Sequence, residues 1–262
     1  MSRKCIIGIL LLCACSAPKP ALPDTVAVRI FARHRITELE LSGASLKLTR
    51  ISAQGALLRV EDAAVRNVSS ITLGEGITHV RARSDAWLAA RVYAGTISLT
   101  AGDGEIIIIN HTPFETWVHN AAVAELGGLI HAAHESPAER ELVMAQEIAI
   151  RSFAVSERNR HDGPCQFCDL THCSVYQGII SGTDSLSMGR VLMRGKKVIP
   201  AYFHSTCGGG TVLPSLLWKD ASDTGFHKVN DACDGKTACR RSPHHRWHSF
   251  ITWAEIASAL GV

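Results

Sequence analysis

The sequence lacks a surplus of charge of either sign and lacks any apolar run long enough to cross a bilayer. Charged residues make up 19% of its 262 positions and the formal net charge is +3, so no basic field favours nucleic acid as a partner. The composition typical of disorder is also lacking, because 46% of the residues are apolar. These values predict a globular protein that buries one large core or two modest ones.

The first twenty residues, "MSRKCIIGILLLCACSAPKP", are typical of an export signal. The apolar run from Ile6 to Leu12 is far shorter than the roughly 20 residues that span a bilayer. The segment "LCAC" resembles a bacterial lipobox, which predicts a signal at 1–15, a lipid on Cys15 and a tether at 16–24. We therefore expect an exported, membrane-anchored lipoprotein that faces the cell wall or periplasm. Plain secretion after cleavage at nearby small residues is the alternative.

Short runs such as "VAVRIF", "ELELSG" and "SITLG" alternate apolar and polar residues between Val26 and Asn110. This period of two predicts strands joined by turns, so we expect a β-rich region at 25–112. The region carries no cluster of catalytic residue types and is interpreted as a scaffold.

Helical patterns follow. "WVHNAAVAEL" predicts a helix from about Trp117 that stops at Gly127, and Ser136 with Glu139 predicts a capping box for a second helix that runs to about Arg158. We expect this helix to bury one face, made of Leu142, Ala145, Ala149 and Phe153. A hairpin around Gly195 and a final helix after Thr252 complete the pattern. The fold class is therefore predicted to be α+β, with a β-rich N-terminal half followed by an α+β catalytic region at 113–262.

The stretch "CQFCDLTHCSVYQG" at 165–178 concentrates cysteine and histidine. Cys168, His172 and Cys173, with His161 upstream, offer two thiolates and two imidazoles, which is a tetrahedral Zn²⁺ set. Disulfides with incidental histidines are one alternative, and a cysteine nucleophile with a histidine base is another.

Two charged residues of the helical region are candidates for chemistry. Glu125 lies in an alanine- and valine-rich helix directly before two glycines, where burial would raise its pKa, although a solvent-facing glutamate is the ordinary alternative. The ordinary role of Arg151 is an i, i+4 pair with Glu147.

The corner "AYFHSTCGGGT" at 201–211 ends a strand in polar and glycine residues. Such a corner presents backbone N–H groups and hydroxyls to a polar ligand. It also fits a tight turn held by a disulfide of Cys207.

These segments together resemble the SpoIID/LytB family of stage II sporulation protein D and an amidase enhancer. "WVHNAAVAEL" resembles "YVxGVxAxE", "AQEIAIRSFAVSERNRH" resembles "AQAVAARTYA…H", and "FCDLTHCSVYQG" resembles "DxCDxTHCQxYxG". "AYFHSTCGGGT" resembles "AYFHSxxGGxT", and "SPHHRWHSFITWAEI" resembles the closing "SPxxxW" segment.

The resemblance implies a peptidoglycan lytic transglycosylase that cuts the bond between N-acetylmuramic acid and N-acetylglucosamine in glycan strands, often strands stripped of peptides. It implies Glu125 as the catalytic acid, Arg151 as a second catalytic residue, and Zn²⁺ on His161, Cys168, His172 and Cys173. Substrate contacts are expected from the following residues: Tyr176, His204, Ser205, Thr206, Gly208, Gly209 and Thr211.

Three departures from the family pattern bear on these roles. The segment after Glu125 is longer than usual and brings a rival acid, Glu135, while Ser174 replaces the usual glutamine and Cys165 is an extra cysteine. The resemblance also favours a disulfide between Cys207 and Cys239, since both flank segments that the family places near its cleft.

Two other functions stay open. A non-catalytic peptidoglycan-binding module that enhances a cell-wall amidase is one, and a zinc-dependent hydrolase is the other.

Overall fold

The computed structural model describes residues 20–261 except 45, 85, 86, 130–135, 159, 162, 220, 224 and 234. The expected signal, Cys15 and Glu135 lie outside these residues. No helix in the described ranges is long and apolar enough to cross a membrane. The chain divides into two compact units, Met1–Val198 and Ile199–Val262. The predicted boundary at 112/113 therefore falls inside the first unit.

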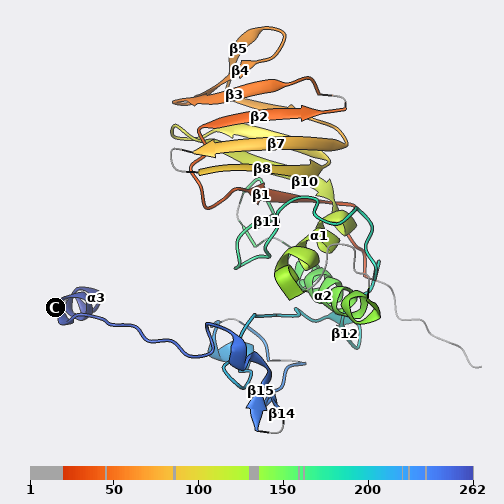
Figure 1. Ribbon diagram of the computed structural model, residues 1–262, viewed down its shortest axis with the longest axis vertical. Helices are drawn as coiled ribbons and strands as arrows, with labels where there is room; N and C mark the ends of the chain where they lie inside the picture. Colours follow the sequence, from red (N-terminus) through yellow and green to blue (C-terminus); the bar gives the residue numbers. More distant parts are fainter. Residues whose placement is uncertain are drawn as a thin grey trace, which may run out of the picture. The chain divides into compact units, whose positions relative to one another are not determined.

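The first unit contains two sheets, seen in Figure 1. One has the strand order β5-β4-β3-β2-β7-β8 and the other β11-β1-β10-β9-β6. The strands of the first sheet are β2 (Glu38–Gly43), β3 (Thr49–Gln54), β4 (Leu57–Glu61), β5 (Val65–Val68), β7 (Ile77–Ser84) and β8 (Trp87–Ala94). Those of the second are β1 (Thr25–Ile30), β6 (Ser70–Leu73), β9 (Thr96–Ala101), β10 (Ile106–Pro113) and β11 (Phe167–Cys168).

The alternating residues of these strands form the core. β10 contacts β8 and β4 contacts β9, so the two sheets pack on each other. Buried apolar side chains line both sheets: Val28, Leu39, Leu41, Ile51, Leu58, Val60, Val80, Ile97, Leu99 and Ile108. Burial of such side chains is the main favourable contribution to folding. The predicted β-rich, α+β organisation is confirmed.

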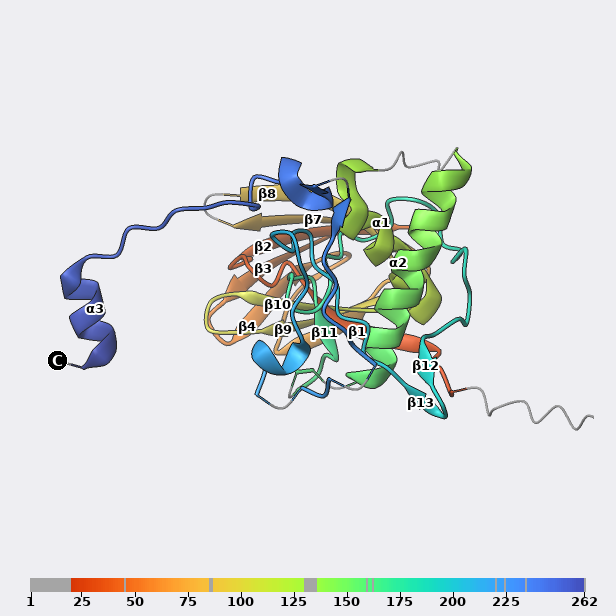
Figure 2. The ribbon, with the colours of Figure 1, turned by 90° about the horizontal axis from the view of Figure 1, so that it is seen from below.

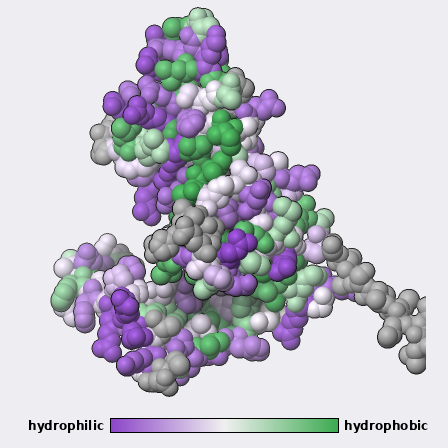
Figure 3. Space-filling model, turned by 45° about the vertical axis from the view of Figure 1, so that its right-hand side comes forward, coloured by the Kyte–Doolittle hydropathy of each residue, from purple (hydrophilic) through white to green (hydrophobic). Residues whose placement is uncertain are grey.

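Charged pairs cover the outer side of the strands. Arg50 binds Glu40 at 3.1 Å and Arg66 binds Asp62 at 2.7 Å on exposed positions. Hydrophilic side chains accordingly cover much of the β-rich part at the top of Figure 3. Pairs of this kind contribute little stability, so this face acts mainly as a solvated surface.

Two helices lie against each other and α1 also contacts β1 and β10, as Figures 1 and 2 show. They are α1 (Phe114–Leu126) and α2 (Pro137–Ser156), with a short 3-10 turn, η1, at Gly127–Leu129. α1 ends at Gly127 as predicted, but it begins at Phe114 rather than near Trp117.

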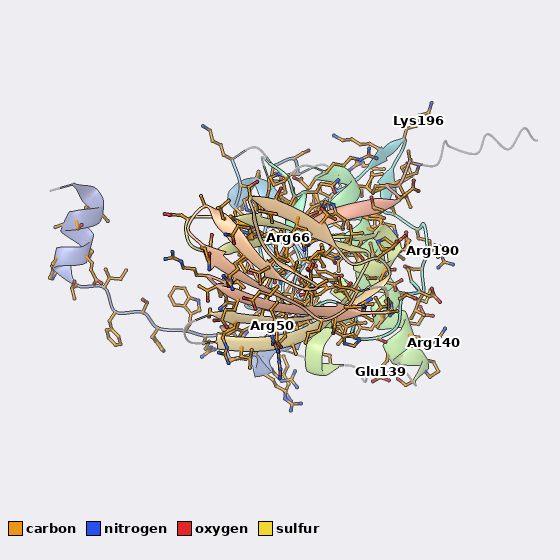
Figure 4. All side chains as sticks on the ribbon, turned by 90° about the horizontal axis from the view of Figure 1, so that it is seen from above. Arg50, Arg66, Glu139, Arg140, Arg190 and Lys196 are labelled. Atoms are coloured by element: carbon orange, nitrogen blue, oxygen red, sulfur yellow. The ribbon has the colours of Figure 1, made fainter. Side chains whose placement is uncertain are left out.

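The N-terminus of α2 has the predicted capping box. Ser136 accepts from the N–H of Glu139, and the Glu139 carboxylate accepts from the N–H of Ser136. Figure 4 labels Glu139 at this end of the helix. The predicted buried face is confirmed at Phe153, but Leu142 is 41% exposed and its neighbour Val143 is fully buried instead. Val143 packs with Val123 and Leu126, so α1 decides which face of α2 is covered.

A hairpin closes the first unit. It pairs β12 (Met193–Arg194) with β13 (Lys197–Val198) around the predicted turn at Gly195, whose φ of 60° suits glycine. The strands are shorter than the sequence pattern suggests.

The second unit has short elements. They are η2 (Pro214–Leu216), β14 (Ala232–Cys233), β15 (Lys236–Thr237), η3 (Ala238–Arg241) and α3 (Trp253–Leu260). The predicted capping box of Thr252 and Glu255 is present, and Gly261 ends α3 with φ 70°.

Candidate functional site

Glu125 lies in the last turn of α1 and is partly buried. Its Oε1 accepts a hydrogen bond of 2.7 Å from the backbone N–H of Val175 and one of 3.4 Å from the hydroxyl of Ser174. Burial raises the pKa of Glu125, against the lowering effect of these two hydrogen bonds. A carboxyl group with this balance keeps its proton to higher pH than a solvated glutamate and is suited to general acid work.

The four predicted metal ligands lie close together in space, and the last of them, Cys173, is two positions before Val175. One ligand atom from each of His161, Cys168, His172 and Cys173 lies within 4.8 Å of all the others. His161 Nε2 is 3.1 Å from Cys173 Sγ, Cys168 Sγ is 3.5 Å from His172 Nε2, and the two sulfurs are 3.7 Å apart. Tetrahedral zinc with ligand distances of about 2.0–2.3 Å separates its ligand atoms by about 3.3–3.8 Å. The four side chains therefore fit a zinc ion.

The sulfur pair has the electrostatics of a cation site. Its close approach lowers the pKa of Cys173 to about 7 and raises the pKa of Cys168, because the two share one proton in an S–H···S contact. A divalent cation displaces such a proton and takes both sulfurs as thiolates. Cys165 is a free thiol outside this group of four, so its suggested role as a replacement ligand is not needed.

Strand pairing holds the loop of the predicted metal ligands in place. β11 adds in parallel to β1, with Cys168 beside Arg29. The next residue, Asp169, accepts hydrogen bonds from the backbone N–H groups of Phe31 at 2.7 Å and Ala32 at 3.0 Å. Phe31 has φ 56°, a conformation that is costly outside glycine and that these bonds help to maintain.

Arg151 does not have the catalytic position that was predicted. It is fully buried, and its Nε and Nη2 bind the carboxylate of Glu115 at 2.9 and 2.6 Å. Its remaining N–H groups bind the Ser185 and Ser187 hydroxyls and the carbonyl of Arg190, which Figure 4 labels. All five guanidinium donors are thus engaged within the protein, and Arg151 is a structural residue that anchors segment 185–190.

Glu147 does not form the i, i+4 pair with Arg151 that the helical spacing suggested. It is fully buried and binds His119 Nδ1 at 2.7 Å. It also accepts from Ser185, from the N–H of Leu186 and from the N–H and hydroxyl of Ser187. Burial alone raises the pKa of Glu147, but the hydrogen bonds outweigh burial and lower it to about 2.

His119 connects this carboxylate to the next loop. Its Nε2 lies 2.6 Å from the carbonyl of Ser181. Both ring nitrogens of His119 are thus engaged, one by Glu147 and one by Ser181. The sequence signal for this network was a histidine and a glutamate on adjacent helices, which no local pattern connects.

One segment of the chain is similar to a known family. Residues 102–191 match the family model described as SpoIID, Stage II sporulation protein. Over this segment the chain is similar to the SpoIID domain. No curated protein and no solved structure matches the chain. The SpoIID domain indicates a role related to the cell wall, in a family associated with peptidoglycan hydrolysis.

The SpoIID domain includes Glu125 and all four predicted metal ligands, since it runs from the turn before β10 to the segment before β12. It also includes Tyr176, which we predicted to contact substrate. Tyr176 is fully buried and its hydroxyl donates to Asn110 Oδ1 at 3.1 Å. That prediction is wrong, because Tyr176 is part of the core beneath the SpoIID loop.

The glycine-rich corner lies beyond the SpoIID match, in the second unit. It borders a pocket of about 490 Å³ that has His204, Thr206 and Thr211 in its wall but not Ser205, Gly208 or Gly209. Four aromatic residues also line this pocket: Tyr202, Phe203, Trp218 and Phe226. The Tyr202 ring lies 4.7 Å from that of Trp218 and 5.6 Å from that of Phe226. Aromatic faces beside hydroxyl and imidazole groups suit a ligand that is apolar on one face and polar at its edges.

Cys207 and Cys239 are neighbours, as the predicted disulfide requires. Their sulfurs are 3.5 Å apart and both thiols are free. The covalent link between them stays a prediction.

Proposed function

We propose that the protein is a lytic transglycosylase that cleaves peptidoglycan glycan strands, with Glu125 as its acid. The partly buried carboxyl at the end of α1, whose pKa is raised by burial, carries this proposal. Its location in a SpoIID domain adds the substrate class.

One carboxyl group is sufficient for this chemistry. The protonated Glu125 donates its proton to the glycosidic oxygen as the bond from C1 of N-acetylmuramic acid breaks. The resulting carboxylate accepts the proton of the sugar's own C6 hydroxyl while O6 bonds to C1. The products are a free hydroxyl on the released sugar and a 1,6-anhydro ring, and Glu125 ends protonated as it began. Ordinary glycoside hydrolysis uses two carboxyl groups and a water instead.

The hydrogen bonds of Glu125 support both halves of this cycle. The N–H of Val175 and the hydroxyl of Ser174 fix one carboxyl oxygen. They also stabilise the carboxylate that forms once the proton has left. Ser174 therefore helps to hold and stabilise the Glu125 carboxylate. The replacement of the family's usual glutamine by serine did not by itself suggest this role.

Zinc on His161, Cys168, His172 and Cys173 is part of the proposal. Four protein ligands complete a structural site, and when bound the ion neutralises the two thiolates. The loop that ends in Cys173 continues directly into Ser174 and Val175, so a rigid metal loop holds the donors to Glu125 in position.

We further propose that the aromatic pocket of the second unit binds sugar rings, with His204 and the two threonines as polar contacts. Export by the N-terminal signal and a lipid on Cys15 would bring the protein to the wall, as the sequence predicts.

The test is a digest of peptide-free glycan strands by the purified protein beside Glu125→Gln, with products analysed by mass spectrometry. We expect 1,6-anhydro ends from the native protein and at least about 100-fold slower release from the variant. Ser174→Ala is the matched control for the surroundings of the acid and should reduce the rate far less.

Other products would contradict the proposal. Reducing ends that have gained water would identify a hydrolase and direct attention to the zinc. Absence of cleavage by a folded, metal-loaded protein that nevertheless stimulates a cell-wall amidase would identify the enhancer function.

A further inference from the structure

A second cluster of metal-binding side chains lies in the second unit, outside the SpoIID match. Cys207, Asp231 and Cys239 each offer a ligand atom within 4.8 Å of the other two. Cys207 Sγ is 2.8 Å from Asp231 Oδ2 and 3.5 Å from Cys239 Sγ. His245 adds a nitrogen, since its Nδ1 is 3.3 Å from Cys239 Sγ.

Three separate segments bring these groups together. Cys207 precedes the glycine turn, and its sulfur accepts from the N–H of Gly209 at 3.4 Å. Asp231 follows the isolated bridge between Gly210 and Asn230, and its N–H donates to the carbonyl of Gly209. Cys239 lies in η3, from which two successive turns lead to His245. Backbone pairing thus positions the ligand atoms independently of any bond between the sulfurs.

The carboxylate of Asp231 indicates that a cation belongs here. Among the described residues, its Oδ1 is buried and has no hydrogen-bond partner. Leaving a buried carboxylate oxygen unpaired is costly, and the cost grows when thiol sulfurs that can become negative lie beside it. A divalent cation would pair with this oxygen and with both sulfurs at once.

We propose that Cys207, Asp231, Cys239 and His245 form a second centre for zinc or a similar divalent metal. Two sulfurs, one carboxylate and one imidazole are a ligand set that zinc accepts. The 3.5 Å between the two sulfurs and the 3.3 Å between His245 Nδ1 and Cys239 Sγ match the edges of a zinc tetrahedron of about 3.3–3.8 Å. His245 lies outside the group of three whose ligand atoms are all within 4.8 Å of one another, so its ring has to move closer to the other two on binding. The 2.8 Å contact of Asp231 is shorter, so its carboxylate moves outward by several tenths of an ångström on binding.

The centre has a structural role. The second unit has short strands, and units of this size commonly depend on a metal or a disulfide for stability. Cys207 also lines the aromatic pocket, and the neighbouring Thr206 hydroxyl lies 2.6 Å from that of Ser242. The metal therefore holds one wall of the pocket to the segment 239–245.

The first experiment counts metal ions per chain by elemental mass spectrometry on the purified protein. We expect two zinc equivalents for the native chain, one for Cys239→Ser and one for Cys173→Ser. His245→Ala should weaken retention of one equivalent by at least about tenfold, whereas His244→Ala, its exposed neighbour, should retain both.

The second experiment needs no variant and so does not depend on whether Cys239→Ser folds. Cys207 and Cys239 should resist alkylation in the native protein and become reactive after a strong chelator is added without reductant. A peptide map of unreduced protein that shows a Cys207–Cys239 disulfide would overturn the proposal. So would thiols that react equally with and without chelator, or a native chain that binds one equivalent and loses none on Cys239→Ser substitution.

Discussion

Arg151 and Glu115 form a bidentate ion pair that joins the two helices of the SpoIID domain. The guanidinium is fully buried, and its two contacts with the carboxylate measure 2.9 and 2.6 Å. The planar fork of arginine matches a carboxylate in this way, and lysine does not reproduce it. The pair thus gives Arg151 a role in packing the two helices together.

Replacing Arg151 by lysine should destabilise the protein by about 3 kcal/mol, because a buried pair loses one partner's hydrogen bonds. Denaturant unfolding measures this, and cleavage per folded molecule should persist. Arg83→Lys is the matched control, since Arg83 pairs with Glu38 on the surface at 3.8 Å and should change stability by less than about 1 kcal/mol. A variant Arg151→Lys that is as stable as the native protein but inactive would show that Arg151 has a catalytic role.

Glu147 should control stability in acid. Its pKa is lowered to about 2 from an ordinary value of 4.5, so its contribution is fully present above about pH 4.5 and is lost as pH falls through 2. The shift corresponds to about 3 kcal/mol. Unfolding free energies measured between pH 2 and 6 should fall steeply for the native protein and less steeply for Glu147→Gln. Parallel curves would contradict this assignment.

Glu125 should show the opposite dependence. Because its pKa is raised, the stability linked to its proton is present below about pH 4.5 and is lost as pH rises through the folded-state pKa. Glu125→Gln should therefore be at least as stable as the native protein at pH 7 while it loses cleavage. The same titration predicts that kcat/KM falls on the alkaline side. A pH profile without that limb would exclude Glu125 as the acid.

Cys168→Ser and Cys165→Ser separate metal binding from other roles of the cysteine-rich loop. Loss of a structural zinc ligand should lower the melting temperature and release one zinc equivalent. Cys165 lies outside the group of four ligands, so its substitution should leave zinc content unchanged. Differential scanning calorimetry with metal analysis measures both, and equal zinc loss in the two variants would contradict the assigned ligand set.

Trp218→Ala should weaken binding of glycan fragments by about three- to tenfold, the usual contribution of one aromatic face. Trp253→Ala removes a ring that is 84% exposed and that does not line the pocket, so it should bind as the native chain does. Isothermal titration with a peptide-free disaccharide makes the comparison. Equal affinities of all three proteins would remove the pocket from substrate binding.

Local features of the fold were predictable because they depend on neighbouring residues. The capping boxes at Ser136 and Thr252, the end of α1 at Gly127 and the turn at Gly195 all occur as the sequence predicts. The cluster of predicted metal ligands belongs to this group, since Cys168, His172 and Cys173 lie within a few positions of one another.

Nonlocal partners were not predictable in the same way. Spacing on one helix suggested that Arg151 pairs with Glu147. In the structure α1 packs against α2, so Arg151 pairs with Glu115, 36 positions away, and Glu147 binds His119. Tyr176 was predicted to contact substrate and is buried in the core instead. Helical periodicity identifies which residues share a face, but only the neighbouring helix determines which face is covered.

The parallel pairing of β11 with β1 has a consequence for biosynthesis. Gln166 meets Ala27 across 139 positions of sequence, so the strand synthesised first waits for one made much later. Cys168 then reaches its final position only after most of the chain has emerged, and the thiols of the loop stay reactive until that moment. The four residues that we propose as zinc ligands are therefore brought together late in synthesis, after the strands of the β-rich half have been made.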